Sequence, residues 1–98
     1  MTNKTLQLLG LAYRASKITI GTDETLDKIK DKKVCLIFLD KSLSINTIKE
    51  LKSASEANGI KLLDSFTKED LSHAIGKKNI SVIGIIDEGF KKLIEESL

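Results

Sequence analysis

Apolar residues in this chain recur at intervals of three or four positions in five separate stretches, a pattern typical of helices with one buried side. Each stretch follows a residue that can cap a helix, and the five predicted starts are Thr2 or Thr5, Thr22, Ser44, Thr67 paired with Asp70, and Asp87. We expect Asn58-Gly59 to end the third helix and Gly76 to end the fourth. The side chains predicted to face the core from these helices are Leu6, Leu9, Ala12, Tyr13, Leu26, Ile29, Ile45, Ile48, Leu51, Ala54, Leu71, Ala74, Ile75, Phe90, Leu93 and Ile94.

Four short runs of apolar residues lie between the predicted helices and indicate strands, over residues 18–20, 34–39, 60–63 and 80–86. The runs 34–39 and 80–86 are almost continuously apolar, as in strands that are buried on both faces. Strands that alternate with helices predict an α/β fold with helices on both faces of a sheet. Because 98 residues suffice for one core, we expect a single domain over residues 1–98.

Composition and charge narrow this picture only slightly. The chain has one Tyr, three Phe and no Trp, so its core must be mainly aliphatic. A net charge of +2 permits a nucleic-acid partner without indicating one. The charge is unevenly distributed, because residues 1–17 carry Lys4, Arg14 and Lys17 without an acid, whereas residues 87–98 are net negative.

Motifs for catalysis or metal binding are missing from the sequence. It has no phosphate-binding Gly-x-x-x-x-Gly-Lys loop and no Gly-x-Gly-x-x-Gly fingerprint. His73 and Cys35 are the only residues of their kinds, so we interpret His73 as an exposed helix position and Cys35 as a core residue. Asp40 ends a strand as in response-regulator receivers, but the earlier strand has no carboxylate to complete a Mg²⁺ site. We therefore predict a protein that is not an enzyme and needs neither cofactor nor metal.

The sequence contains no signal peptide and no apolar run long enough to span a bilayer. With its single cysteine, the chain is expected to be cytoplasmic and to have no membrane partner.

The start of the second helix is the first candidate binding site. A short β-branched run ends at Gly21, and a helix follows at once. A helix N-terminus has unpaired N–H groups and the positive end of the dipole, so it suits an anion such as an RNA phosphate. Here, however, Asp23 and Glu24 occupy the first turn and Asp27 follows one turn later.

A second glycine, Gly76, precedes Lys77 and Lys78 and a buried strand. By itself this is an ordinary basic turn, but together with the Gly21 helix and the order of elements it makes the chain resemble the family of ribosomal-protein-like RNA binders that recognise kink-turns. The resemblance is greatest to the small bacterial YlxQ-type branch. It runs nearly end to end and is carried by Leu8-Leu-Gly-Leu-Ala-Tyr-Arg-Ala-Ser-Lys17, Ile20-Gly-Thr-Asp-Glu-Thr-Leu26, Leu39-Asp40, Asn46-Thr47, Leu71-Ser-His-Ala-Ile-Gly-Lys77 and Val82-Ile-Gly-Ile-Ile-Asp-Glu-Gly-Phe90.

The resemblance implies a three-layer α/β/α sandwich with a mixed central sheet of about four strands, and a non-catalytic RNA-binding function. It implies three groups of contact residues, one on the recognition helix, one on or beside a loop that packs on an extruded base, and one after the long strand. In that order they are Gly21, Thr22, Asp23, Glu24 and Asp27; Ile75, Gly76, Lys77 and Lys78; and Asp40 and Lys41. Lys30, with Lys17, Lys32 and Lys33, is expected to add electrostatic support.

This chain departs from the family at two of these positions. The family commonly has Asn or Lys where this chain has Asp23, and Lys where it has Asp27, but an ionised Asp cannot donate to a guanine oxygen and repels phosphate. We interpret Asp23 as an acid that stabilises the helix start, whereas Glu24 could serve that role or accept from guanine N–H groups.

Two serines also replace glycines that are common in the family. Ser16 and Ser72 are therefore expected to alter their loops slightly without changing the fold.

Two functions remain open on the sequence. The first is binding of structured or ribosomal RNA, with kink-turns among the candidates. The alternative is a module that has lost kink-turn recognition and binds a protein or the ribosome surface.

Overall fold

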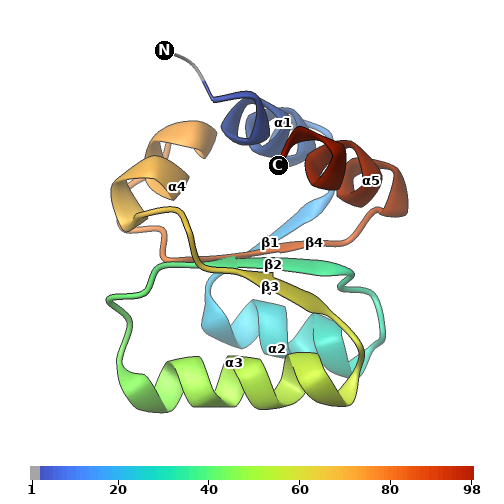
Figure 1. Cartoon of the computed structure of the whole chain (residues 1–98), viewed down its shortest axis with the longest axis vertical. Coiled ribbons are helices and arrows are strands. Elements are labelled where there is room, and N and C mark those ends of the chain that lie inside the picture. The colour runs from blue at the N-terminus through green and yellow to red at the C-terminus, as the bar shows by residue number, and fades with distance from the viewer. Residues whose placement is uncertain (1–2) are drawn as a thin grey trace.

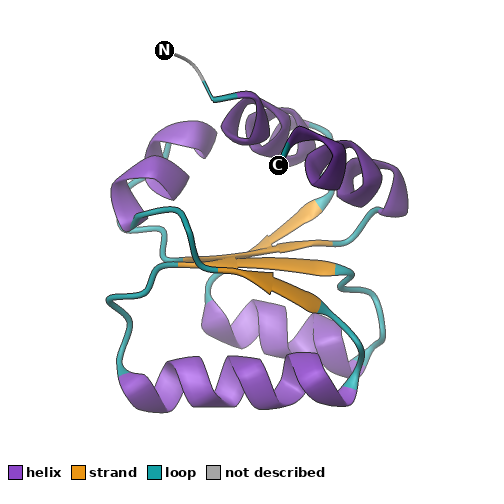
Figure 2. Ribbon diagram, in the orientation of Figure 1, coloured by secondary structure: helices purple, strands orange, loops and turns teal. Residues whose placement is uncertain are grey.

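The computed structural model describes residues 3–98, and Figures 1 and 2 show that it folds into three layers, with helices above and below a central sheet. The predicted alternation of helices and strands is confirmed. In chain order the elements are α1 (Lys4–Arg14), β1 (Ile18–Ile20), α2 (Thr22–Lys30), β2 (Leu36–Leu39), α3 (Ile45–Ala57), β3 (Lys61–Leu63), α4 (Lys68–Ile75), β4 (Val82–Ile85) and α5 (Glu88–Ser97). None of these helices has both the length and the apolar character that crossing a membrane requires.

The sheet is mixed, with the strand order β1-β4-β2-β3. β4 pairs antiparallel with both β1 and β2, while β2 and β3 are parallel and are connected by α3. As a result β1, β2 and β3 all end where β4 begins, and this end is called the carboxyl end of the sheet below. The mixed four-stranded sheet implied by the family resemblance is thereby confirmed.

Two aliphatic clusters fill the spaces between the layers. Helices α1, α4 and α5 cover one face of the sheet, around Leu36 and Phe38 of β2. Helices α2 and α3 cover the other face, around Ile37 and Leu39. All four residues of β2 are buried because alternate side chains enter opposite clusters, which explains the continuous apolar run in the sequence.

Several predicted boundaries were wrong by one or two residues. The strands predicted over 34–39, 60–63 and 80–86 are shorter at one or both ends. The flanking apolar residues still pack against the core, but they lie outside the regular strand pairing. Asn3 caps α1, whereas Thr5 lies inside the helix and its hydroxyl contacts Ser97 Oγ at 2.6 Å. Thr2 lies outside the described residues. The N-cap of α2 is Gly21, not Thr22.

Two residues predicted to face the core are instead exposed. Ile45 is 69 % exposed, and it lies about 120° around α3 from the buried Leu51, given 3.6 residues per turn. Leu93 is 49 % exposed, because its neighbour Ile94 occupies the buried side of α5. The spacing of apolar residues therefore overestimated the width of the buried stripe on both helices.

Candidate nucleic-acid interface

Three loops meet at the carboxyl end of the sheet. The backbone N–H of Gly21 donates to the carbonyl of Val82 over 2.9 Å, which joins the start of α2 to the start of β4. The N–H of Asp40 donates to the carbonyl of Ser81 over 2.9 Å, which joins the loop after β2 to the same place. The loop between α4 and β4 therefore lies between the two other segments that the sequence singled out.

The start of α2 depends on the backbone of Gly21. Its φ of 90° and ψ of 164° fall in a region that essentially only glycine adopts. No side chain caps this helix, whereas the N-cap side chains of α1, α3, α4 and α5 each accept a backbone N–H. The first intrahelical bond runs from the N–H of Thr25 to the carbonyl of Gly21 over 3.2 Å.

Acidic side chains surround this helix start. Asp23, Glu24 and Asp27 are all exposed, and Thr22 is half-buried. One oxygen of Glu24, Oε2, lies 3.4 Å from the N–H of Ile20, so this side chain reaches back over the glycine. Because Glu24 is exposed, its other carboxylate oxygen can accept hydrogen bonds from a ligand.

A buried pair of threonines holds α2 on the sheet. The hydroxyls of Thr19 on β1 and Thr25 on α2 are 2.8 Å apart, and both residues are at most 1 % exposed. Gly84 on β4 lies directly beneath, where an added Cβ would collide with Thr19 Oγ1. This close approach fixes the height of the α2 start above the sheet.

The loop after α4 is held at both ends by one residue, Ser72. Its carbonyl accepts the N–H of Lys77 over 3.0 Å, and its hydroxyl accepts the N–H of Ile80 over 2.9 Å. Within the loop, Gly76 has φ 68° and Asn79 has φ 59°, so two left-handed residues turn the chain. Ser72 therefore stabilises the loop while remaining in helical conformation.

The other serine noted in the sequence, Ser16, does adopt a left-handed conformation, with φ 60°. Such a backbone costs serine more than glycine, as expected for a position where glycine is common.

Helix α1 supports the end of α4. Gly10 lets the two helices approach closely, because an added Cβ would lie 2.7 Å from the carbonyl oxygen of Ala74. Next to this contact, the Lys77 ammonium lies 5.6 Å from the centre of the Tyr13 ring. Ile75 is only 6 % exposed and belongs to the core, so it supports the loop from beneath.

The carboxylate of Asp40 is engaged within its own turn. It is 8 % exposed, and it accepts the hydroxyl of Ser42 over 2.6 Å and the N–H of Ser42 over 3.1 Å. The Ser42 hydroxyl bond, helped by the charge of Lys68, holds the pKa of Asp40 below its usual value. Asp40 thus shapes the turn that presents the exposed Lys41.

The remaining predicted lysines do not gather here. Lys30 is the last residue of α2, about 12 Å along the helix axis from Thr22. Lys17 precedes β1, and Lys32 and Lys33 precede β2, so all three lie at the opposite end of the sheet.

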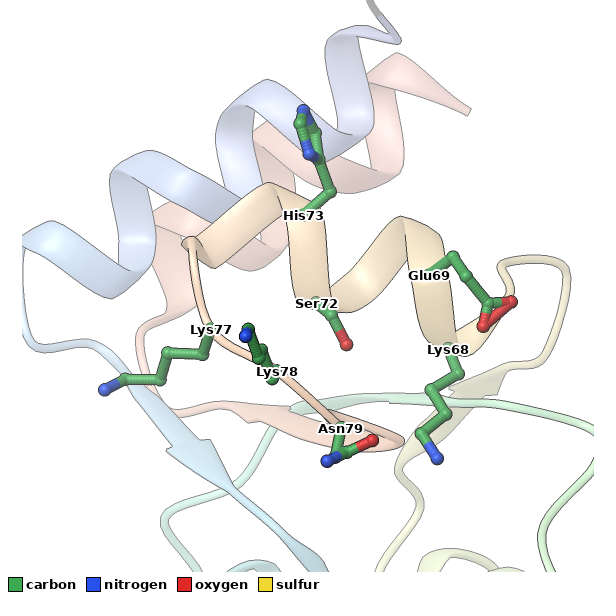
Figure 3. Close-up of a pocket in the computed structure, with 7 residues that line it drawn as sticks. All are labelled: Lys68, Glu69, Ser72, His73, Lys77, Lys78 and Asn79. Carbon is green, nitrogen blue, oxygen red and sulfur yellow. The ribbon is translucent and has the colours of Figure 1, made fainter.

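The structure adds residues that the sequence did not single out. An open pocket of about 420 Å³ beside α4 is lined by Lys68, Glu69, Ser72, His73, Lys77, Lys78 and Asn79 (Figure 3). Lys68, at the start of α4, and Asn79, near the end of the loop that follows it, line the pocket from opposite ends. Only the capping box at Thr67 and the glycine at the other end of the helix were visible in the sequence, and neither indicates a pocket between them.

The single cysteine of the chain packs against the core and is hydrogen-bonded to the sheet. Cys35 is half-buried, and its thiol donates to the carbonyl of Ile85 over 3.3 Å. Burial raises the pKa of Cys35 to about 12, helped by the Glu88 carboxylate, which as a hydrogen-bond acceptor and a negative charge favours the protonated thiol, so the thiol is protonated at neutral pH. Within residues 3–98, no three His, Cys, Asp or Glu side chains form a group that could hold a metal ion.

Comparison with known proteins adds relatives of stated function. The chain is 33 % identical over 93 residues to the RNA-binding protein YlxQ of Enterococcus faecium, covering 95 % of this chain and 89 % of that protein. It is 32 % identical over 88 residues to the RNA-binding protein YlxQ of Bacillus subtilis strain 168, covering 89 % and 88 %.

Two solved structures have the same fold as this chain. A Bacillus halodurans protein described as having unknown function superimposes with a TM-score of 0.92 at 30 % identity, over 97 % of this chain and 96 % of the other. A 15.5 kD RNA-binding protein of Giardia lamblia superimposes with a TM-score of 0.82 at 20 % identity, over 93 % and 78 %, which shows a shared fold.

The family model described as the ribosomal protein L7Ae/L30e/S12e/Gadd45 family matches residues 3–95, nearly the whole chain. Together with the two YlxQ relatives, this match confirms the resemblance inferred from the Gly21 and Gly76 segments. The chain belongs to the ribosomal protein L7Ae/L30e/S12e/Gadd45 family, in its bacterial YlxQ-like branch.

Proposed function

We propose that this protein binds structured RNA at the carboxyl end of its sheet, through the start of α2 and the loop of Ile75 to Lys78. The observation that carries the proposal is that the loop after α4 leads into β4, whose first residue, Val82, accepts the N–H of Gly21 at the start of α2 over 2.9 Å. Both YlxQ relatives are described as RNA-binding proteins, which also supports a function without catalysis. A cytoplasmic location goes with this proposal.

The two segments offer complementary chemistry to an RNA. The start of α2 supplies backbone N–H groups and the Thr22 hydroxyl, while Glu24 can accept from the N–H groups of a guanine. Lys77 and Lys78 supply cations for phosphates, whose contacts contribute a large part of affinity. Gly76 presents backbone with no side chain, which leaves room for a base to approach.

The acids of α2 distinguish this chain within its family. Asp23 cannot donate to a guanine oxygen, and Asp27 repels phosphate. Since each bidentate base contact provides roughly 1–3 kcal/mol of discrimination, we propose that kink-turns bind more weakly here than in family members that carry Asn or Lys. Ribosomal RNA is the other structured RNA that we propose as a partner.

The first experiment measures mobility shifts on a panel of kink-turn RNAs and ribosomal RNA fragments across a salt series. Reversing both charges, Lys77→Glu with Lys78→Glu, is expected to weaken binding strongly, and wild-type affinity is expected to fall with salt. The matched control reverses Lys32 and Lys33, an adjacent pair at the opposite end of the sheet with the same change in net charge. Absent binding, salt-independent binding or an equal effect of both pairs would refute the proposal.

One observation favours the alternative, a module that binds a protein or the ribosome surface: three exposed acids line the first two turns of α2. The double substitution Asp23→Asn with Asp27→Lys separates the two functions. If the wild type binds kink-turns and the substitutions only tighten that binding, RNA recognition stands. If the substitutions create kink-turn binding that the wild type lacks, the alternative gains support and kink-turn recognition by this chain is excluded.

A further inference from the structure

The turn from β1 into α2 is closed by two buried threonines. Thr19 on β1 and Thr25 on α2 are six positions apart, on either side of Gly21, and their hydroxyl oxygens lie 2.8 Å from each other. The backbone N–H of Thr25 also donates to the carbonyl of Gly21, which forms the first turn of α2. Because no side chain caps this helix, the hydroxyl pair is a buried anchor between the start of α2 and the sheet.

The surroundings of the pair are tightly packed. A Cβ added at Gly84 would collide with the Thr19 hydroxyl, and it would lie 3.2 Å from the Thr25 methyl and 3.4 Å from a methyl of Val34. Two valines would fill the same space, and replacing both partners of a buried hydrogen bond by apolar groups of similar shape costs little stability. The hydroxyls add direction, because a hydrogen bond fixes the distance between its atoms, whereas apolar contacts are non-directional.

The groups next to this anchor are those that we propose to meet RNA. Glu24 directly precedes Thr25, and its Oε2 reaches back to the N–H of Ile20. Gly21 itself restricts the turn little, because glycine is free to adopt many backbone conformations. A hydrogen bond to a base tolerates only a few tenths of an ångström in length. The position of the α2 start must therefore be fixed from outside the glycine, and the threonine pair is placed to do so.

We propose that Thr19 and Thr25 are positioning residues for RNA binding, whose hydroxyl pair holds the start of α2 at the height where Glu24 and the N–H groups of the first turn meet a base. The inference rests on the proposed function and adds to it two residues that are buried and so act through α2 instead of contacting RNA.

The test is a double-mutant cycle of Thr19→Val and Thr25→Val. Each single substitution leaves one buried hydroxyl without its partner and should lower the midpoint of urea unfolding. The double substitution removes both hydroxyls and should regain most of the wild-type midpoint. Its RNA affinity is nevertheless expected to fall by about fivefold or more, the equivalent of one base contact. Fluorescence anisotropy measures this with the RNA of the panel that the wild type binds most tightly.

Two further variants separate positioning from stability. Thr25→Ser keeps the hydroxyl but removes the methyl beside Gly84, so it should lose stability and keep wild-type affinity, the reverse of the double valine variant. Thr5→Val is the matched control, because Thr5 and Ser97 form a hydroxyl pair of 2.6 Å between α1 and α5, on the other face of the sheet from α2 (Figure 1). It should also lose stability without losing affinity.

The outcomes distinguish this inference from the proposed function. If the double valine variant binds RNA like the wild type while Lys77→Glu with Lys78→Glu still weakens binding, the inference is overturned and the proposed site stands. An equal loss of affinity in Thr5→Val would show a general effect of stability and also overturn it. A wild type that binds none of the RNAs refutes both.

Affinities are compared at a temperature where thermal melts show each variant to be folded. If the double valine variant does not fold, Thr25→Val and Thr25→Ser decide the question, and equal affinities of these two variants overturn the inference.

Discussion

The loop after α4 depends on a left-handed residue at Gly76, and this dependence can be tested without disturbing any contact. Gly76 has φ 68°, and an added Cβ would meet no atom within 4 Å. The substitution Gly76→Ala therefore introduces backbone strain alone. Gly59, at the end of α3, has φ 64° and equally open surroundings, but it precedes β3 and so lies at the opposite end of the sheet.

The expected loss of stability follows from the backbone conformation of the two glycines. A left-handed conformation costs an alanine about 1–2 kcal/mol, and the loss of unfolded-state entropy offsets about 0.4–1 kcal/mol of this. The free energy of unfolding should thus fall by about 1 kcal/mol for Gly76→Ala and by the same amount for Gly59→Ala. If Gly76 instead leaves the left-handed region, the bond from Lys77 N–H to the Ser72 carbonyl is lost, at a similar cost.

Urea unfolding measures both stabilities, and fluorescence anisotropy measures RNA affinity at a temperature where both variants are folded. Equal destabilisation is expected, with weaker RNA binding for Gly76→Ala only. In thermal melts the change corresponds to a shift of about 4–8 °C for a domain of this size. The reasoning is refuted if Gly76→Ala is as stable as the wild type, or if Gly59→Ala weakens RNA binding to the same extent.

Three further predictions concern single side chains. Ser72→Ala removes the acceptor for the N–H of Ile80 and should destabilise the fold by about 1–3 kcal/mol, with faster hydrogen exchange at Ile80; unchanged exchange would contradict the role given to Ser72. Asp40→Asn should lower stability at pH 7. Because the folded-state pKa of Asp40 is depressed, the stability that this carboxylate contributes is present above its unfolded pKa of about 3.9 and is lost as pH falls through the folded value. The difference in unfolding free energy between wild type and Asp40→Asn should therefore shrink below about pH 4. If urea unfolding at several pH values gives a constant difference, the bond between Asp40 and Ser42 is not the cause of the stability difference. Cys35, with its pKa raised to about 12, should react with a disulfide reagent at pH 8 far more slowly in the folded protein than in urea, and equal rates would contradict its burial.

Local signals in the sequence predicted most of the elements and their ends. Ser44, the Thr67–Asp70 capping box and Asp87 cap their helices as expected, and Gly76 ends α4 in the left-handed conformation. These features succeed because a cap or a left-handed glycine depends on atoms within a few residues of the chain. The cap of α2 failed as a prediction because a glycine with an unusual backbone, joined to β4, replaces the side-chain cap.

Tertiary structure decided which of the predicted site residues lie together. The sequence alone indicated the Gly21 and Gly76 segments and, through the family resemblance, their common purpose. It could not show that Asp40 turns inward onto Ser42, that Lys30 lies far along its helix, or that Lys68 and Arg14 flank the loop. Those relations depend on the strand order and on the packing of α4 against α1 through Gly10, which join residues distant in the chain. Helix periodicity and capping are local properties, whereas the charge of a binding surface is set by whichever distant segments the core brings to it.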